Sequence, residues 1–200
     1  MGAAMAAPFA LFRVSFRAIK RILTGEILNR IDLEIAGGLG TASLLLKRER
    51  NSGNRYVVLV VRAAWVYYYL FELEEFDRFI EAADEIRASQ TSPVAILPDA
   101  TPKLGHRTAM VLGGEVLRRI DTEIYAGHLK ISLRLKREKN TAHEYVVLAT
   151  IALGWYLYYP FELNEFHRFV AAAKKIRAAA PSFNPGVHPS SPGLRPGLEG

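Results

Sequence analysis

The sequence consists largely of one unit written twice. Residues 26–59 align with residues 115–148 at a constant offset of 89, and 19 of these 34 positions are identical. Residues 65–88 align with residues 155–178 at an offset of 90, with 15 of 24 positions identical. Ungapped matches of this length identify an internal duplication, so a fold assignment has to explain both copies.

Each copy shows the period of strands first and the period of a helix afterwards. Residues 27–35 alternate apolar and polar side chains and carry β-branched residues, which predicts a strand. A glycine-containing turn, a second strand ending in a basic run, and a third strand from Tyr56 follow. The aromatic run WVYYYLF predicts a fourth strand. The offset changes between Val60 and Trp65, which indicates a β-bulge or a different turn length there.

After the fourth strand, apolar residues recur at steps of three and four. They run from Leu73 to Ile86 in the first copy and from Leu163 to Ile176 in the second. This spacing predicts an amphipathic helix. The fold class is therefore α+β, with two tandem β-β-β-β-α repeats whose antiparallel curved sheets pack with two amphipathic helices.

Composition divides the chain into five segments. We expect a basic N-terminal segment, repeat one, a proline-containing linker, repeat two, and a Pro/Gly-rich disordered tail. Their predicted bounds are 1–23, 24–89, 90–107, 108–180 and 181–200.

The charge of the chain favours a polyanionic partner. The net charge is +6 and the pI is about 9.6. From Glu26 to Ala88, 8 Lys/Arg and 11 Asp/Glu give −3, whereas from Glu115 to Ala178, 11 Lys/Arg and 7 Asp/Glu give +4. We therefore expect repeat two to carry most of the attraction.

The N-terminal segment is open to two interpretations. It is rich in Ala, Phe and Arg and has no acidic residue before Glu26, as is typical of a transit peptide, which would place the protein in the mitochondrion or another organelle. The alternative is an ordinary surface helix, with a location in the nucleus or cytoplasm. The longest apolar run, residues 56–71, is too short to span a bilayer and contains Arg62, so no membrane partner is expected.

Catalysis finds little support in the sequence. The chain has no cysteine, which excludes thiol chemistry, and its five histidines lack metal-ligand spacing. Two carboxylates recur in both copies, Asp32 with Glu34 and Asp121 with Glu123. An acid–base pair is conceivable there, but a solvated strand face with salt bridges to Lys47 and Lys136 is favoured. We expect no enzyme activity, no metal and no cofactor.

Basic and aromatic side chains on neighbouring strands favour binding of single-stranded nucleic acid. Cations neutralise phosphates, and aromatic rings stack on unpaired bases. The alternatives are a solvated strand edge for the cations and a core position for each tyrosine. The candidate residues are Arg30, Lys47, Arg48, Arg50 and Tyr68 in repeat one, and Arg119, Lys130, Arg134, Lys136, Arg137, Lys139 and Tyr158 in repeat two.

The third strand is apolar on both faces. From Tyr56 to Val61 every residue is apolar or aromatic, and one helix covers only one face of a sheet. The other face has to meet the second repeat, a second subunit or a ligand. On this basis we expect a homo-oligomer, a dimer or tetramer.

The helix entry of each copy resembles a known superfamily. In each copy, three predicted strands precede a fourth strand that runs into the helix. The stretches concerned are YYYLFELEEFDRF (Tyr67–Phe79) and YYPFELNEFHRF (Tyr158–Phe169). This pattern is similar to the single-stranded nucleic-acid binders of the Whirly and PUR-repeat type, and to positive cofactor four with its one unit. The resemblance implies non-catalytic binding of single-stranded DNA or RNA in transcription, genome maintenance or RNA processing. The alternatives are a structural or scaffolding subunit of a larger protein or ribonucleoprotein assembly, whose basic face meets ribosomal RNA or an acidic protein, and a small-ligand enzyme.

Overall fold

The computed structural model describes residues 18–63, 66–91, 113–125, 127, 129–139, 143–152 and 155–180. The N-terminal segment up to residue 17, Trp65, most of the predicted linker and the tail lie outside the described residues.

Two antiparallel four-stranded sheets form the protein, each followed by one helix. The strands of each sheet pair in sequence order. The first sheet and its helix are β1 (Glu26–Ile35), β2 (Gly40–Arg48), β3 (Arg55–Arg62), β4 (Val66–Glu72) and α2 (Leu73–Ala88). The second set is β5 (Glu115–Ile124), β6 (Leu129–Arg137), β7 (Glu144–Ala152), β8 (Trp155–Glu162) and α4 (Leu163–Ala178). A further helical segment, residues 18–24, precedes β1. The predicted α+β class and its two antiparallel sheets are confirmed.

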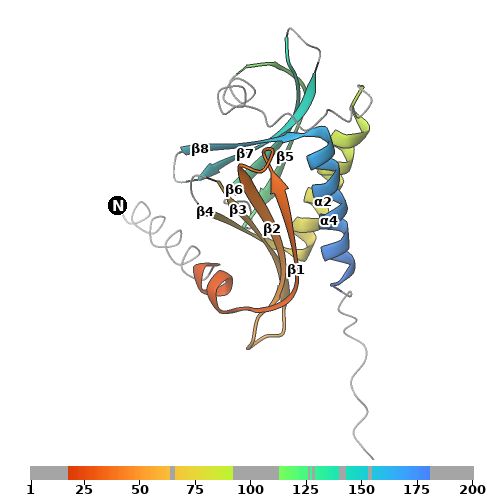
Figure 1. The fold of residues 1–200 in the computed structure, drawn as a ribbon. Coiled ribbons are helices and arrows are strands. Elements are labelled where there is room, and N and C mark those ends of the chain that lie inside the picture. Colours follow the sequence, from red (N-terminus) through yellow and green to blue (C-terminus); the bar gives the residue numbers. More distant parts are fainter. Residues whose placement is uncertain are drawn as a thin grey trace, which may run out of the picture.

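The two repeats share one hydrophobic core. Helices α2 and α4 lie side by side on one side of the molecule, with the sheets against them (Figure 1). Each helix packs on both sheets: α2 contacts β5 and β6 as well as β3 and β4, and α4 contacts β1 and β2 as well as β7 and β8. Phe79 and Phe169, at equivalent positions of the two copies, meet edge to face with ring centroids 6.1 Å apart. Neither repeat therefore buries its helix without the other.

A buried glutamate in α4 ties one repeat to the other. Glu165 closes a capping box by accepting a hydrogen bond from the Glu162 N–H at 3.0 Å. The same carboxylate accepts the backbone N–H groups of Ala36 and Gly37, at 3.2 Å and 2.6 Å, from the turn between β1 and β2. One side chain thus serves both the capping of α4 and one of the contacts between the repeats.

The structure corrects the extent of the predicted basic strand. The strand ends at Arg48, so Arg50 lies in the following turn, and Lys139 lies in the equivalent turn of repeat two. The Glu49 N–H bonds the Asn54 carbonyl at 2.8 Å and reverses the chain. Gly53 in this turn has φ +73°, a conformation that glycine adopts without strain.

The irregularities of the sheets lie on the first strands. Pairing shifts between Ile27 and Asn29 in β1 and between Val116 and Arg118 in β5. The predicted irregularity after β3 falls at residues 64–65 and 153–154, which lie outside the described residues.

Both apolar faces of β3 are covered within the chain. Val57, Leu59 and Val61 belong to the shared core. Val58 and Val60 belong to a smaller cluster on the opposite face, where Ile22, Leu45 and Tyr125 pack against them. The apolar faces of β3 therefore need no second subunit, and the expected homo-oligomer stays a prediction.

Candidate nucleic-acid interface

Each sheet has one face packed against the helices and one facing away from them, here called the outer face. Strand register and the alternation of side chains place the outer-face residues. In repeat one they include Arg30, Asp32, Ser43, Lys47, Arg62 and Tyr68. In repeat two they include Arg119, Asp121, Lys130, Ser132, Arg134, Lys136 and Tyr158. Eight of the twelve predicted nucleic-acid-binding residues thus lie on an outer face, whereas Arg48 and Arg137 have the opposite parity and Arg50 and Lys139 lie in turns.

Residues 18–24 cover one half of the outer face of repeat one. The guanidinium of Arg21 lies over the ring of Tyr56, 4.3 Å from its centroid, and pairs with Glu72. The Tyr56 hydroxyl donates to the Arg21 carbonyl at 2.7 Å. Beneath the segment, the Lys47 ammonium donates to the Ile22 carbonyl, and only 4% of Lys47 is exposed. We call the part around Lys47, Tyr56 and Glu72 the closed half.

Lys136 in repeat two is buried in the same way. It is 6% exposed, and its ammonium lies 6.0 Å from the ring centroid of Tyr145. The Tyr145 hydroxyl donates to the Gly113 carbonyl at 3.4 Å, so the chain before β5 reaches this side chain. Burial lowers the pKa of both Lys47 and Lys136 because the charged form loses hydration. The buried ammonium groups of these two predicted site residues do not face solvent.

The other half of each outer face carries a row of four residues across the four strands. In repeat one the row is Asp32, Ser43, Val60 and Tyr68, from β1 to β4. In repeat two it is Asp121, Ser132, Ala149 and Tyr158. Tyr68 is 48% exposed and Tyr158 is partly exposed. We call this part, with its flanking arginines, the open half.

Two arginines flank the aspartate of the row in repeat one. Arg30, two residues before Asp32 on β1, bonds its carboxylate at 2.8 Å and 3.0 Å. Arg62 from β3 donates from Nη1 to the Ser43 hydroxyl at 2.8 Å. Hydrogen bonds from Ser43 and Arg30 lower the pKa of Asp32. Asp32 therefore stays ionised and holds Arg30 and Ser43 in place.

Repeat two builds the same arrangement, but its second arginine lies at a different position. Arg119 bonds Asp121 at 2.9 Å and 2.8 Å, and Arg134 from β6 donates from Nε to the Ser132 hydroxyl at 3.2 Å. The Arg134 guanidinium also lies 5.9 Å from the ring centroid of Tyr158, within cation–π range. The hydrogen bonds of Arg119 lower the pKa of Asp121, to which Ser132 contributes.

Ion pairs hold most of the other predicted cations. Arg48 pairs with Glu26 at 2.7 Å, and Lys130 pairs with Glu123 at 3.2 Å. Arg137 bonds the buried carboxylate of Glu144 at 2.8 Å and the Thr91 hydroxyl at 2.9 Å, and so anchors the chain that follows α2. The salt bridges predicted from the strand-one carboxylates to Lys47 and Lys136 are wrong, because register places Ile27 and Val116 opposite these lysines.

Sequence reasoning missed Arg62. Its signal was present, since Arg62 is the one charged residue in the apolar run from residue 56 to residue 71. A cation that interrupts a run of this kind has to leave the core, and strand alternation puts it on the face of Lys47 and Tyr68.

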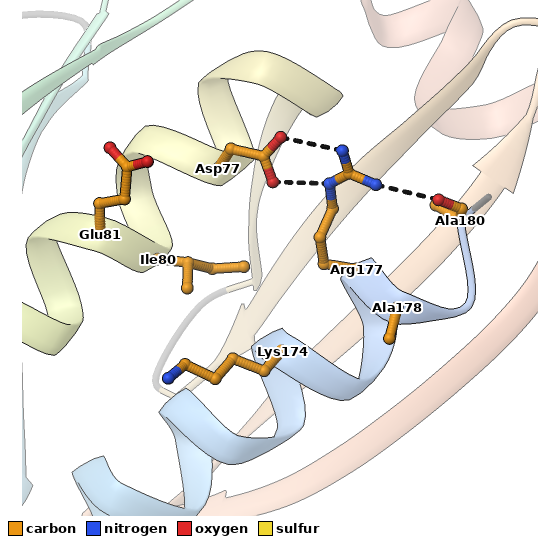
Figure 2. A pocket seen from close by; sticks show the side chains of 7 residues that line it. All are labelled: Asp77, Ile80, Glu81, Lys174, Arg177, Ala178 and Ala180. Atoms are coloured by element: carbon orange, nitrogen blue, oxygen red, sulfur yellow. Dashed lines mark hydrogen bonds and ion pairs between the residues drawn. The ribbon is translucent and has the colours of Figure 1, made fainter. Parts of the chain in front are cut away.

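A groove between the two helices does not offer cations to a ligand. It is lined by Asp77, Ile80, Glu81, Lys174, Arg177, Ala178 and Ala180. Figure 2 shows Arg177 bonded to both carboxylate oxygens of Asp77, at 2.6 Å and 2.9 Å, and to the Ala180 carbonyl. Lys174 pairs with Asp84 at 2.7 Å. These contacts join the repeats, so the groove is structural.

The histidines of the described ranges have protein partners. His143 lies 2.8 Å from a Glu162 carboxylate oxygen, and His167 lies 2.7 Å from the Gln90 side-chain oxygen. No group of three or more potential metal ligands occurs among the residues that the structure describes.

Comparison with protein families and with curated proteins gives no match. The chain matches no protein-family model, and no curated protein is significantly similar to it in sequence. Among the described residues, no helix has the length and hydrophobicity needed to cross a membrane.

Proposed function

We propose that the protein binds single-stranded DNA or RNA, without catalysis, along the open halves of its two outer faces. The observation that carries this proposal is the row that ends in a tyrosine, exposed in Tyr68 and partly exposed in Tyr158, and is flanked by two arginines, present once on each sheet. Guanidinium groups bind phosphates, and a tyrosine ring beside them stacks on an unpaired base.

The shape of the surface favours a flexible strand over a duplex or a small molecule. The candidate side chains spread across four neighbouring strands. Of the two described pockets, one lies between the helices and the other lies between α2 and β5, where Asp121 and Glu123 line its edge. Stacking on a ring of this kind requires an unpaired base, which a duplex does not present.

Repeat two is the more basic partner in this proposal. Its open half holds Arg119, Arg134 and Lys130 against Asp121 and Glu123, which gives +1. The corresponding part of repeat one holds Arg30 and Arg62 against Asp32 and Glu34, which gives zero. Net attraction of phosphate therefore concentrates on the second sheet.

The proposal extends to the superfamily named above. Two four-stranded meanders, each followed by a helix that packs on both sheets, resemble the Whirly and PUR-repeat architecture. A likeness of fold supports a function only by analogy, so the open halves carry the argument.

Fluorescence anisotropy with a labelled 12-nucleotide single strand tests the proposal. We expect saturable binding that weakens steeply as salt rises from 50 mM to 200 mM, because each neutralised phosphate releases counterions. Replacing Tyr68 and Tyr158 together by leucine is expected to weaken binding by about 1–3 kcal/mol per lost stack.

The matched control is Lys175→Ala, which removes an exposed cation from α4, away from both outer faces. It is expected to leave the affinity unchanged. Affinity that does not depend on salt, or a double leucine variant that binds like the control, contradicts the proposal.

One observation favours a second function, that of a structural subunit in a larger assembly. Arg48, Lys130 and Arg137 are each held by a carboxylate of the protein itself. In that case the purified protein does not bind a short oligonucleotide alone, and the anisotropy titration separates the two functions.

A further inference from the structure

The two open halves place an arginine beside the same serine from two different strands. Arg62 lies on β3 and Arg134 lies on β6, the second strand of its sheet. At an offset of 89, the position equivalent to Arg134 is Leu45, and the position equivalent to Arg62 is Ile151. Each copy therefore has an arginine where the other copy has an apolar residue, and yet each guanidinium reaches the serine of its row.

The reach of both arginines follows from the register. Ser43 and Val60 are opposite one another, and Arg62 is two residues further along β3 on the same face. Arg134 is two residues from Ser132 on one strand and on the same face. In both arrangements the guanidinium arrives at the serine of the row, at 2.8 Å and 3.2 Å.

The serines hold these guanidinium groups in position through hydrogen bonds. Ser43 is 1% exposed and Ser132 is 7% exposed, and both interact with the aspartate of their row. A buried serine between a carboxylate and a guanidinium is satisfied and leaves the ligand no room at its hydroxyl. A guanidinium has five N–H donors, and the contact with serine uses one of them. Both arginines are partly exposed, so the outer face presents them to a ligand.

We propose that Arg62 and Arg134 are equivalent phosphodiester-binding residues, one on each sheet, each held in position by the serine and aspartate of its row. This inference rests on the proposed function and assigns the phosphate contact within it. Arg62 thus replaces Lys47, which the closed half buries, as the principal cation of repeat one.

Equilibrium binding of an unmodified 12-nucleotide oligothymidylate tests the assignment. Arg62→Gln and Arg134→Gln are each expected to weaken binding about tenfold, since each loses a charge-assisted hydrogen bond. Each is also expected to lower the slope of log K against log salt by about 0.7, the value of one phosphate on a single strand. Arg134→Gln is expected to have the larger effect because repeat two carries the net positive charge.

The matched control is Arg55→Gln. Arg55 lies on the same strand as Arg62, but strand alternation puts it on the helix-covered face. The substitution therefore removes the same charge from the same strand without changing the outer face. It is expected to change neither the affinity beyond about twofold nor the salt slope. Equal losses in Arg55→Gln and Arg62→Gln overturn the assignment and indicate general charge attraction.

A transplanted arginine tests the equivalence itself. Arg134→Leu combined with Ile151→Arg moves the guanidinium of repeat two to the position that Arg62 occupies in repeat one. The double variant is expected to recover the affinity and the salt slope that Arg134→Leu loses. A folded double variant that binds no better than Arg134→Leu overturns the equivalence.

Serine variants keep the test decisive if the double variant does not fold. Ser43→Ala and Ser132→Ala leave every charge in place, and both are expected to weaken binding with an unchanged salt slope. Unchanged affinity in both serine variants would show that the serines do not position the arginines, and it overturns the proposal. If the unmodified protein does not bind the oligonucleotide at all, the proposed function fails. If it binds with salt dependence but the arginine variants keep the same affinity and salt slope, only this inference fails.

Discussion

Tyr69 and Tyr159 occupy the same position of the two copies, and their hydroxyl oxygens lie 3.1 Å apart in the shared core. A contact between a residue and its own counterpart is the mark of a two-fold axis, as in a symmetric dimer. Tyr69 also reaches the Thr150 hydroxyl, at 3.0 Å, whose counterpart at position 61 is valine. The two repeats therefore pair as two subunits would, with one polar contact that breaks the symmetry.

This asymmetry predicts unequal effects of two matched substitutions. Tyr69→Phe leaves the buried hydroxyls of Thr150 and Tyr159 without their common partner, and we expect a loss of about 2–3 kcal/mol of unfolding free energy. Tyr159→Phe leaves the bond between Tyr69 and Thr150 intact, and about 1 kcal/mol is expected. Urea unfolding measures both; a Tyr159 variant at least as unstable as the Tyr69 variant contradicts the network.

The carboxylate of Glu165 is expected to contribute more than helix capping alone. Glu165→Ala loses the acceptor of three backbone N–H groups, two of them from the turn between β1 and β2. We expect a loss of about 3 kcal/mol, because hydrogen bonds to a charged acceptor exceed neutral ones. The control is Glu74→Ala, an exposed glutamate in the first turn of α2, for which less than about 1 kcal/mol is expected. Similar denaturant midpoints for the two variants exclude a role of Glu165 in joining the repeats.

Gly25 is required where residues 18–24 meet β1. A Cβ added there would lie 1.8 Å from the hydroxyl oxygen of Tyr56, which is fully buried and bonded to the Arg21 carbonyl. Gly25→Ala is therefore expected to displace residues 18–24 and to cost about 1–3 kcal/mol. Hydrogen exchange is expected to show lost protection in this segment. Gly53→Ala, where the space is open and only the positive φ is strained, is the control and is expected to keep that protection.

The pKa values of two histidines are expected to lie on opposite sides of the ordinary value of about 6.5. The hydrogen bond to the Glu162 carboxylate raises the pKa of His143, because it favours the charged imidazolium. Stabilisation by His143 is thus complete below the unfolded-state pKa and is lost as pH rises through the folded-state pKa. His143→Phe, which keeps a ring over Tyr145, is expected to cost stability at pH 5.5 and little at pH 9.

Burial, followed by the charge of Arg87, lowers the pKa of His167. Its neutral form is favoured in the folded state, so its contribution is present at high pH and declines as pH falls below about 6.5. Histidine proton shifts followed by NMR measure both pKa values, and the His143→Phe variant assigns the signals of His143. A pKa of His143 below that of His167 contradicts both the bond of His143 to Glu162 and the burial of His167 beside Arg87.

Local patterns predicted much of this fold, because strand and helix periods are set by neighbouring residues. Alternation along residues 27–35 placed Arg30 and Asp32 on the face of Lys47, and the steps from Leu73 to Ile86 placed α2. Repetition of the pattern supported each assignment a second time.

What the patterns missed depends on contacts between distant segments. Parity put Lys47 on the correct face, but residues 18–24 bury it, and no period within the sheet reports that cover. Tyr69 and Tyr159 were recognised as equivalent positions, yet their hydrogen bond requires the two sheets to pack around one axis. Arg62 escaped because its apolar surroundings suggested a strand of core residues only.

Photo-cross-linking tests the central claim most directly. A single strand that carries 4-thiothymidine is irradiated on the intact protein, and the linked residues are mapped by mass spectrometry. We predict cross-links at Tyr68 and Tyr158, on the outer faces, and none at the core residues Tyr69 and Tyr159. Cross-links confined to α2 and α4, or none at a saturating concentration of protein, would contradict binding on the open halves.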